Sequence, residues 1–186
     1  MKKYEEIYEE VKRRLSYKRF NHCICTMKRA VEYAKKYKQD EEKIKLVALT
    51  HDIAREIKKE DIPYILRKYN VRLDEMEKYN VNLSHSKIGA QICKKEFGFD
   101  NQMCNAIRFH TTGRENMSMM EKILFVADAT GEDRHYENTE RIYKLALKNI
   151  DLAIIEIIKE TIQDLSNKKR KIHLNTIKTY NYYIKI

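Results

Sequence analysis

Apolar side chains recur every three or four positions along most of this chain, which is the spacing of one face of an α-helix. The spacing predicts an amphipathic helix over residues 4–15 and a second helix over residues 17–37. Residues 43–56 are apolar almost all round, and Asp40 stands where it can cap them. We therefore expect a third helix that is central and buried.

The segment at residues 58–83 interrupts this pattern. It is more polar and contains Pro63, the single proline of the chain, so we expect short helices that cover the rest of the fold. After it, Ser84 is expected to cap a helix that runs to Phe97. Gly98 suits the C-terminal end of that helix because glycine readily adopts a positive φ.

The C-terminal half returns to the helical spacing. It predicts helices over residues 101–110 and 117–129, and then one long helix over residues 139–165. Residues 168–186 begin basic and end in a periodic Tyr/Ile pattern, which favours a tail docked on the protein. No segment alternates as a strand does, so residues 1–186 are expected to form a single all-α domain, an orthogonal helical bundle.

Composition narrows the class of protein only in part. The 38 basic residues exceed the 28 acidic ones, for a formal net charge of +10, but they are dispersed as on solvated helix faces. The four cysteines form no CxxC pair, and we interpret them as buried reduced thiols. The chain shows no membrane span and no signal peptide, so we expect a cytoplasmic protein without membrane contact. A homodimer is left open.

Two histidines and two aspartates fall on apolar helices: His22, His51, Asp52 and Asp128. Buried imidazole and carboxylate groups are costly unless they are hydrogen-bonded, paired or bound to a metal. Adjacent helical residues point about 100° apart, so His51 and Asp52 can share one ion only near a helix end or irregularity. The set predicts a divalent metal site, with iron, manganese, cobalt or zinc as candidates and open positions for water and substrate.

The order H…HD…D resembles that of the HD-domain metal-dependent phosphohydrolases. The segments KRFNHCICT, HDIARE, SHSKIGA, IRFHTTGRENMSMMEKILFVAD and IHLNTIKTYN are similar to one branch, the YqeK-type symmetrical diadenosine tetraphosphate hydrolases. The similarity extends over nearly the whole chain. It implies an all-helical fold of the HD-domain type and hydrolysis of diadenosine tetraphosphate to two ADP. It also implies an active-site metal, which is iron in structures of the branch.

The same resemblance implies which positions meet the metal and the substrate. The metal ligands are His22, His51, Asp52 and Asp128. The positions that contact the nucleotide or lie beside it are Arg19, His22, Asp52, His85, His110, Thr111, Asp128, Arg134, Lys171, Ile172, His173, Leu174, Asn175 and Thr176.

Local sequence gives physical reasons for two of these positions. His85 follows Ser84 at the expected start of a helix, where free N–H groups and the helix dipole favour an anion. His110 precedes a run of small hydrogen-bond donors that can wrap a phosphate oxygen. Both histidines are also candidate ligands of a second metal, although we favour the phosphate role. His135 has no motif support and is expected at the surface.

The hypothesis for the reaction gives catalytic roles to Asp52, His110 and Arg134. A metal-bound hydroxide attacks a central phosphorus, Asp52 orients the water, and Arg134, His110 and Thr111 stabilise the developing negative charge. One departure from the branch bears on this hypothesis. Residues 129–133 lack its usual Pro-Gly turn and carry two acids, so the shape of this loop and its contact with substrate are open.

Two other functions stay open from the sequence. An HD phosphohydrolase could act on a deoxynucleotide or a guanosine alarmone instead, and a basic helical module could bind RNA or a ribosomal partner. An RNA-binding module has no need of a buried H…HD…D set, because phosphate contacts supply its affinity. The predicted partner is therefore a dinucleoside polyphosphate and not a nucleic acid.

Overall fold

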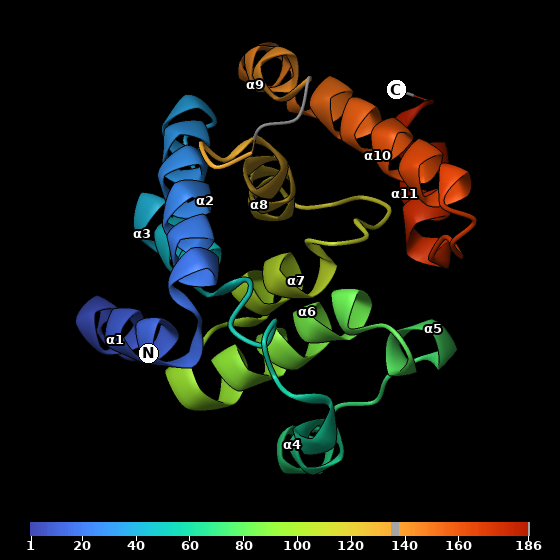
Figure 1. Ribbon diagram of the computed structural model, residues 1–186. Helices are drawn as coiled ribbons and strands as arrows, with labels where there is room; N and C mark the ends of the chain where they lie inside the picture. The colour runs from blue at the N-terminus through green and yellow to red at the C-terminus, as the bar shows by residue number, and fades with distance from the viewer. Residues whose placement is uncertain (135–137, 186) are drawn as a thin grey trace.

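The computed structural model describes residues 1–134 and 138–185, and every regular element within them is a helix (Figure 1). The elements are α1 (Tyr4–Arg14), α2 (Tyr17–Lys36), α3 (Glu41–Thr50), the 3-10 turn η1 (Lys59–Asp61), α4 (Ile62–Tyr69), α5 (Glu75–Lys78), α6 (Val81–Ile92), the π-helical η2 (Cys93–Phe97), α7 (Asn101–Phe109), α8 (Met119–Thr130), α9 (Thr139–Lys148), α10 (Ile150–Asn167) and α11 (Leu174–Tyr183). The all-helical prediction is confirmed.

Helices α2, α3 and α8 form the centre of the bundle. α2 packs against both of the others, and α8 lies between α2 and α10 (Figure 1). α3 buries every residue from Leu46 to Thr50, and α8 buries Ile123, Leu124 and Val126. Burying one such aliphatic side chain stabilises the fold by roughly 1.5–3 kcal/mol. These helices are therefore held firmly in place, together with the polar side chains on them.

The third helix ends earlier than its apolar pattern predicts. α3 begins after Asp40, its predicted N-cap, but stops at Thr50, and residues 51–56 form consecutive turns. The Thr50 hydroxyl and His51 Nδ1 both bond to backbone carbonyls one turn back. Such bonds compete with the helical ladder. The prediction of a helix through residue 56 is wrong, whereas the placement of His51 and Asp52 at a helix end is confirmed.

Helix α6 begins before the predicted cap. Asn80 is the N-cap, because its side-chain oxygen accepts a hydrogen bond from a first-turn backbone N–H at 3.0 Å. Ser84 is buried inside the helix instead, and His85 lies in the second turn, with Nδ1 3.0 Å from the carbonyl of Val81. The predicted position of His85 at a helix start is therefore wrong, while its contact with phosphate stays a prediction. Gly98 ends this region with a φ of 74°, as predicted.

The helix predicted over residues 139–165 is two helices, α9 and α10. Asn149 between them is extended, with φ −153° and ψ 109°, and its side chain accepts a hydrogen bond from the Asp151 N–H at 2.9 Å. This cap starts α10 afresh. The apolar spacing hid the break because Ala146 and Ile150, on either side of it, are both buried.

The C-terminal tail packs on the body of the protein. α11 lies against α10, and Tyr183 near its end is fully buried (Figure 1). The Thr179 hydroxyl donates to the Asn175 carbonyl at 2.6 Å and lies 3.2 Å from the Thr112 carbonyl, in the loop that follows α7. Gly113 permits this approach, because its φ is 64° and a Cβ there would lie 2.7 Å from Thr179. The tail is therefore tied to the loop that carries His110 and Thr111.

Residues 58–83 contain short helices, as expected. η1 leads into α4, which packs on α6, and α5 follows with Asp74 as its cap. All four cysteines are buried and free, which agrees with their interpretation as thiols. None of the helices in the described ranges has the length and apolar character that a bilayer crossing requires.

Candidate metal centre

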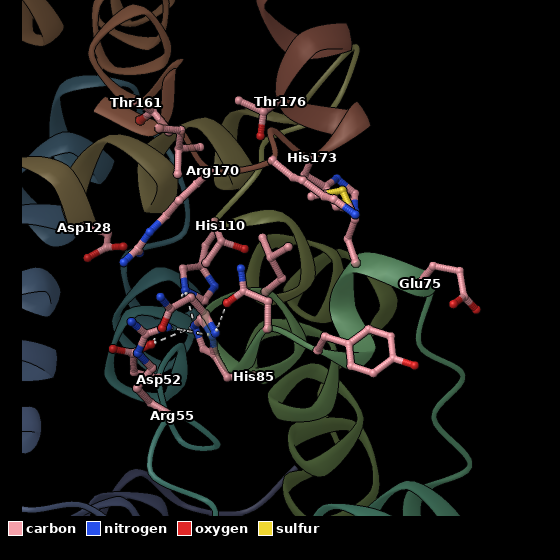
Figure 2. A pocket seen from close by; sticks show the side chains of 18 of the residues that line it. Asp52, Arg55, Glu75, His85, His110, Asp128, Thr161, Arg170, His173 and Thr176 are labelled. Carbon is pink, nitrogen blue, oxygen red and sulfur yellow. Dashed lines mark hydrogen bonds and ion pairs between the residues drawn. The ribbon is translucent and has the colours of Figure 1, made fainter. Parts of the chain in front are cut away.

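The imidazoles and carboxylates singled out in the sequence come together at one place. His22 comes from the middle of α2, His51 and Asp52 from the end of α3, and Asp128 from the last turn of α8. They are joined by His85 from α6 and His110 at the C-terminal end of α7. Figure 2 shows Asp52, His85 and His110 converging on the floor of a pocket, with Asp128 on one side of it.

Asp52 stands between two pairs of imidazoles. Its Oδ1 lies 3.0 Å from His85 Nε2 and 3.7 Å from His110 Nε2. Its Oδ2 lies 3.6 Å from His51 Nε2 and 3.9 Å from His22 Nε2. A carboxylate in this position can bind cations on both of its oxygens.

Asp128 joins the second of these pairs, His22 and His51. Its Oδ1 lies 3.0 Å from His22 Nε2 and 3.9 Å from His51 Nε2. One donor atom from each of these three residues lies within 4.8 Å of the other two, which suits a single metal ion. His51, Asp52 and His110 form a second set of the same kind.

The hydrogen bonds of the ring Nδ1 atoms turn the opposite nitrogens toward the centre. His51 Nδ1 lies 2.7 Å from the Ala48 carbonyl, and His22 Nδ1 lies 2.8 Å from Asp133 Oδ2. A carbonyl can only accept, so the Nδ1 of His51 carries the proton and its Nε2 carries a lone pair. That Nε2 is buried and has no hydrogen-bond partner in the described part of the chain. A buried imidazole lone pair that faces carboxylates fits a metal cation.

His85 and His110 face one another in the same way. The Nδ1 of each lies against a backbone carbonyl, at 3.0 Å for His85 and 2.7 Å for His110, and the two Nε2 atoms lie 3.1 Å apart. Two ring nitrogens at this distance attract one another only when a proton or a cation lies between them. The pair therefore keeps the second metal open as an alternative to phosphate contact.

Burial and charge fix the ionisation of the cluster. Burial lowers the pKa of His51 to about 4 and also lowers the pKa of His85. Burial alone would raise the pKa of Asp128, but the hydrogen bond from His22 and the charge of Arg134 hold this pKa well below its usual range. The pKa of Asp52 is likewise lowered against its burial, by the neighbouring histidines. Neutral His51 and His85 beside ionised carboxylates suit a divalent cation, whereas the pKa of His22 is raised against its burial by the hydrogen bond with Asp128.

Two arginines lie against the carboxylates. Arg19 Nη1 is 2.8 Å from Asp52 Oδ2. Arg134 donates from Nε to the Asp128 carbonyl at 2.8 Å, and its Nη2 reaches Asp128 Oδ1 and lies 3.2 Å from His22 Nε2. Both guanidinium groups are therefore positioned at the edge of the cluster, where a bound phosphate would meet them.

The cluster opens into a cavity of about 850 Å³, which we call the main pocket. Thr161, Arg170, His173 and Thr176 face the floor from the opposite wall (Figure 2). The lining residues that carry charge or a titratable ring are Arg19, Asp52, Arg55, Glu75, His85, His110, Asp128, Arg134, Arg170, Lys171 and His173. A cavity of this size lies within the usual range for small-molecule sites, about 300–1,000 Å³.

The predicted substrate positions divide into three groups. The positions that line the main pocket are Arg19, Asp52, His85, His110, Thr111, Asp128, Arg134, Lys171, His173 and Thr176. His22 is buried and lies outside this lining, as does the predicted metal ligand His51. Ile172, Leu174 and Asn175 lie outside it as well, and the last two line a neighbouring cavity of about 510 Å³. His135 falls outside the described residues.

Arg55, Arg170 and Asp133 are charged residues at the site to which no role was assigned from the sequence. Arg55 lines the pocket with Nη1 3.1 Å from His85 Nδ1, and Arg170 lies on the opposite wall. Asp133 belongs to the altered loop, and its carboxylate fixes the ring of His22. The only features in the sequence that could have indicated a role are the position of Arg55, three residues after the HD pair, and the position of Asp133, next to Arg134. Neither feature shows which side chain its residue contacts.

Comparison with known proteins gives the same picture. A family model described as the HD domain matches residues 19–133. The chain is 31% identical to the symmetrical bis(5'-nucleosyl)-tetraphosphatase of Bacillus subtilis, over 97% of each chain. It is 36% identical to the protein of the same name from Halalkalibacterium halodurans, over 92% of this chain and 91% of that one.

A solved structure shares the fold as well. The crystal structure of a predicted HD superfamily hydrolase involved in NAD metabolism, from Clostridium acetobutylicum, superposes with a TM-score of 0.94 at 33% identity. The match covers 100% of this chain and 98% of that one. Together with the matching family model and the two relatives, this places the chain in the HD-domain family, in the branch of the symmetrical bis(5'-nucleosyl)-tetraphosphatases.

Proposed function

We propose that this protein is a metal-dependent hydrolase that cleaves diadenosine tetraphosphate symmetrically to two ADP. The observation that carries the proposal is the His/Asp cluster on the floor of a pocket whose other walls are basic. Arg19, Arg55, Arg134, Arg170 and Lys171 all line that pocket. A polyphosphate chain is the kind of ligand that so many fixed cations favour. The two relatives are named as bis(5'-nucleosyl)-tetraphosphatases, which supports a substrate with a nucleoside at each end of the polyphosphate.

His22, His51, Asp52 and Asp128 would hold the metal, and the lone pair on His51 Nε2 supports that assignment. We propose iron as the metal; manganese and cobalt suit the same ligands. When bound, a divalent cation at this place lowers the pKa of a water molecule and withdraws charge from phosphate oxygens. The proposal covers one ion at these four ligands, with His85 and His110 left for the phosphate.

The other residues bind and orient the substrate. Asp52 accepts a hydrogen bond from the attacking water and sets its direction toward phosphorus. Arg134, held against Asp128, would place its positive charge beside the phosphate under attack, and His110 and Thr111 lie on the same rim. Because these donors are fixed before the reaction, charge that develops in the transition state is stabilised without rearrangement.

The test is metal analysis of anaerobically purified protein, followed by identification of the products from diadenosine tetraphosphate. We expect metal on the protein, two ADP as products, and loss of turnover on chelation that iron restores better than manganese or cobalt. ATP and AMP as products would contradict symmetrical cleavage. Faster turnover of a deoxynucleoside triphosphate or a guanosine alarmone would assign the site to another nucleotide.

A further inference from the structure

A second cavity, of about 500 Å³, meets the main pocket at the metal centre. It lies between α8, α9 and α10, and we call it the α9–α10 pocket. The residues that line both cavities are His110, Thr111, Asp128, Arg134, Thr161 and Leu165. Figure 2 shows two of them, Asp128 and Thr161, on one side of the main pocket. The cluster therefore stands between two cavities.

The inner wall of the α9–α10 pocket is apolar. Phe125, Ile142 and Ile157 line it, and each is at most 9% exposed. A flat heterocycle can bury its faces against such side chains, and the volume lies within the range of about 300–1,000 Å³ that small-molecule sites occupy.

Two buried polar atoms on residues of this pocket have no hydrogen-bond partner. They are Oγ1 of Thr139 and Oε1 of Glu160, each without a donor or acceptor among the residues that the structure describes. The Glu160 side chain as a whole is 42% exposed, and its Oε1 lies 3.8 Å from Arg141 Nη2. Oxygens without a hydrogen-bond partner can accept one from a ligand in this pocket.

The charges of the two cavities differ. The main pocket has five arginines and lysines, whereas beyond the shared rim the α9–α10 pocket has Glu160, Asp164 and Lys168. Lys168 is already paired with Asp164 at 2.6 Å. Phosphate is disfavoured beside these carboxylates, while the amino group of a base or the hydroxyls of a ribose can donate to them.

We infer that the α9–α10 pocket binds the second nucleoside of the substrate, with Glu160 and Thr139 as its hydrogen-bonding groups. The inference rests on the proposed function. Symmetrical cleavage leaves a nucleoside diphosphate on each side of the attacked bond, so the two nucleosides must lie on different sides of the centre. The main pocket then takes one nucleoside with its phosphates, and the α9–α10 pocket takes the other end. Glu160 and Thr139 are thereby specificity residues for a two-ended substrate.

The experiment compares Glu160→Ala with Glu156→Ala. Both glutamates are on α10, one turn apart, and both pair with Arg141, but Glu156 lines neither cavity. For Glu160→Ala we expect the KM for diadenosine tetraphosphate to rise about tenfold, equal to about 1.4 kcal/mol, with kcat nearly unchanged. The inhibition constant of adenosine tetraphosphate, which lacks the second nucleoside, should stay constant. Glu156→Ala should change neither value.

Ile142→Phe supplies a second variant, which narrows the pocket without removing a charge. It should raise the KM for the two-ended substrate and leave inhibition by adenosine tetraphosphate as it was. An unchanged KM in Glu160→Ala, or equal increases in KM and in the inhibition constant, would overturn the inference while wild-type protein still released two ADP. Failure of the wild-type protein to release two ADP would instead defeat the proposed function.

Discussion

The floor of the main pocket and the wall that faces it are built differently. On the floor, His51 and His85 are at most 1% exposed, and each ring is fixed by a bond from Nδ1 to a backbone carbonyl. On the wall, Arg170 and Lys171 are exposed, and the guanidinium of Arg170 has no hydrogen-bond or ion-pair partner among the described residues. His173 anchors this wall to α5 through Asp74 at 3.0 Å.

This difference between floor and wall suggests that the floor catalyses the reaction and the wall binds the substrate. Groups on the floor are held before substrate arrives, as catalysis by fixed charges requires. Groups on the wall have rotational freedom, and they can follow a flexible polyphosphate. Changes on the floor should therefore alter kcat and metal content, and changes on the wall should alter KM.

The largest expected effect comes from Asp52, the carboxylate shared by both pairs of imidazoles. Asp52→Ala should lower kcat by about 1,000-fold or more and remove metal from the purified protein, because it deletes both a ligand and the group that orients water. Metal content by plasma spectrometry and ADP release measure the two effects. Glu156→Ala is the control, and circular dichroism checks the fold. Normal turnover and metal content in Asp52→Ala would rule out the assigned roles.

A smaller effect on the same floor is expected from Asp133, which fixes the ring of His22. Removing an outer partner of a metal ligand typically costs about 10- to 100-fold in metal affinity or activity. Asp133→Ala should show a loss of this size in a metal titration. The neighbouring Glu132 is exposed and lies 3.7 Å from Lys28, so Glu132→Ala is a matched control that should titrate like the wild type. Equal effects of the two variants would show that the loop acts only through its total charge.

The smallest effect is expected on the wall. Arg170→Ala should raise the KM for diadenosine tetraphosphate about fivefold with little change in kcat, since an exposed cation contributes only about 1 kcal/mol. The increase should shrink as salt is raised, because ions screen exposed charges. Lys178→Ala removes an equal charge from the exposed face of α11, outside the main pocket, and should leave KM as it is. A fall in kcat for Arg170→Ala would place this residue with the floor instead.

The four metal-site residues could be predicted from the sequence because the residues around each of them form a recognisable apolar pattern. His22, His51, Asp52 and Asp128 lie on or beside helices with apolar neighbours, so their convergence could be expected. Three of them are buried, and Asp128 is half-buried. The apolar spacing did not predict where helices begin, end or are interrupted. Asn80 replaced Ser84 as a cap, and Asn149 split one predicted helix into two, because caps depend on backbone angles that apolar spacing does not record.

The sequence by itself determined the helical class, the H…HD…D set and, through the resemblance of whole segments, the family. These follow from period, residue type and order along one chain. Only the tertiary structure decided that Asp133 orients His22, that Arg55 and Arg170 reach the main pocket, and that Glu160 lines a second cavity. The two partners in the first of these contacts are 111 residues apart, and packing of separate helices brings them together. Spacing along one helix carries no information about which side chains of another helix it will face.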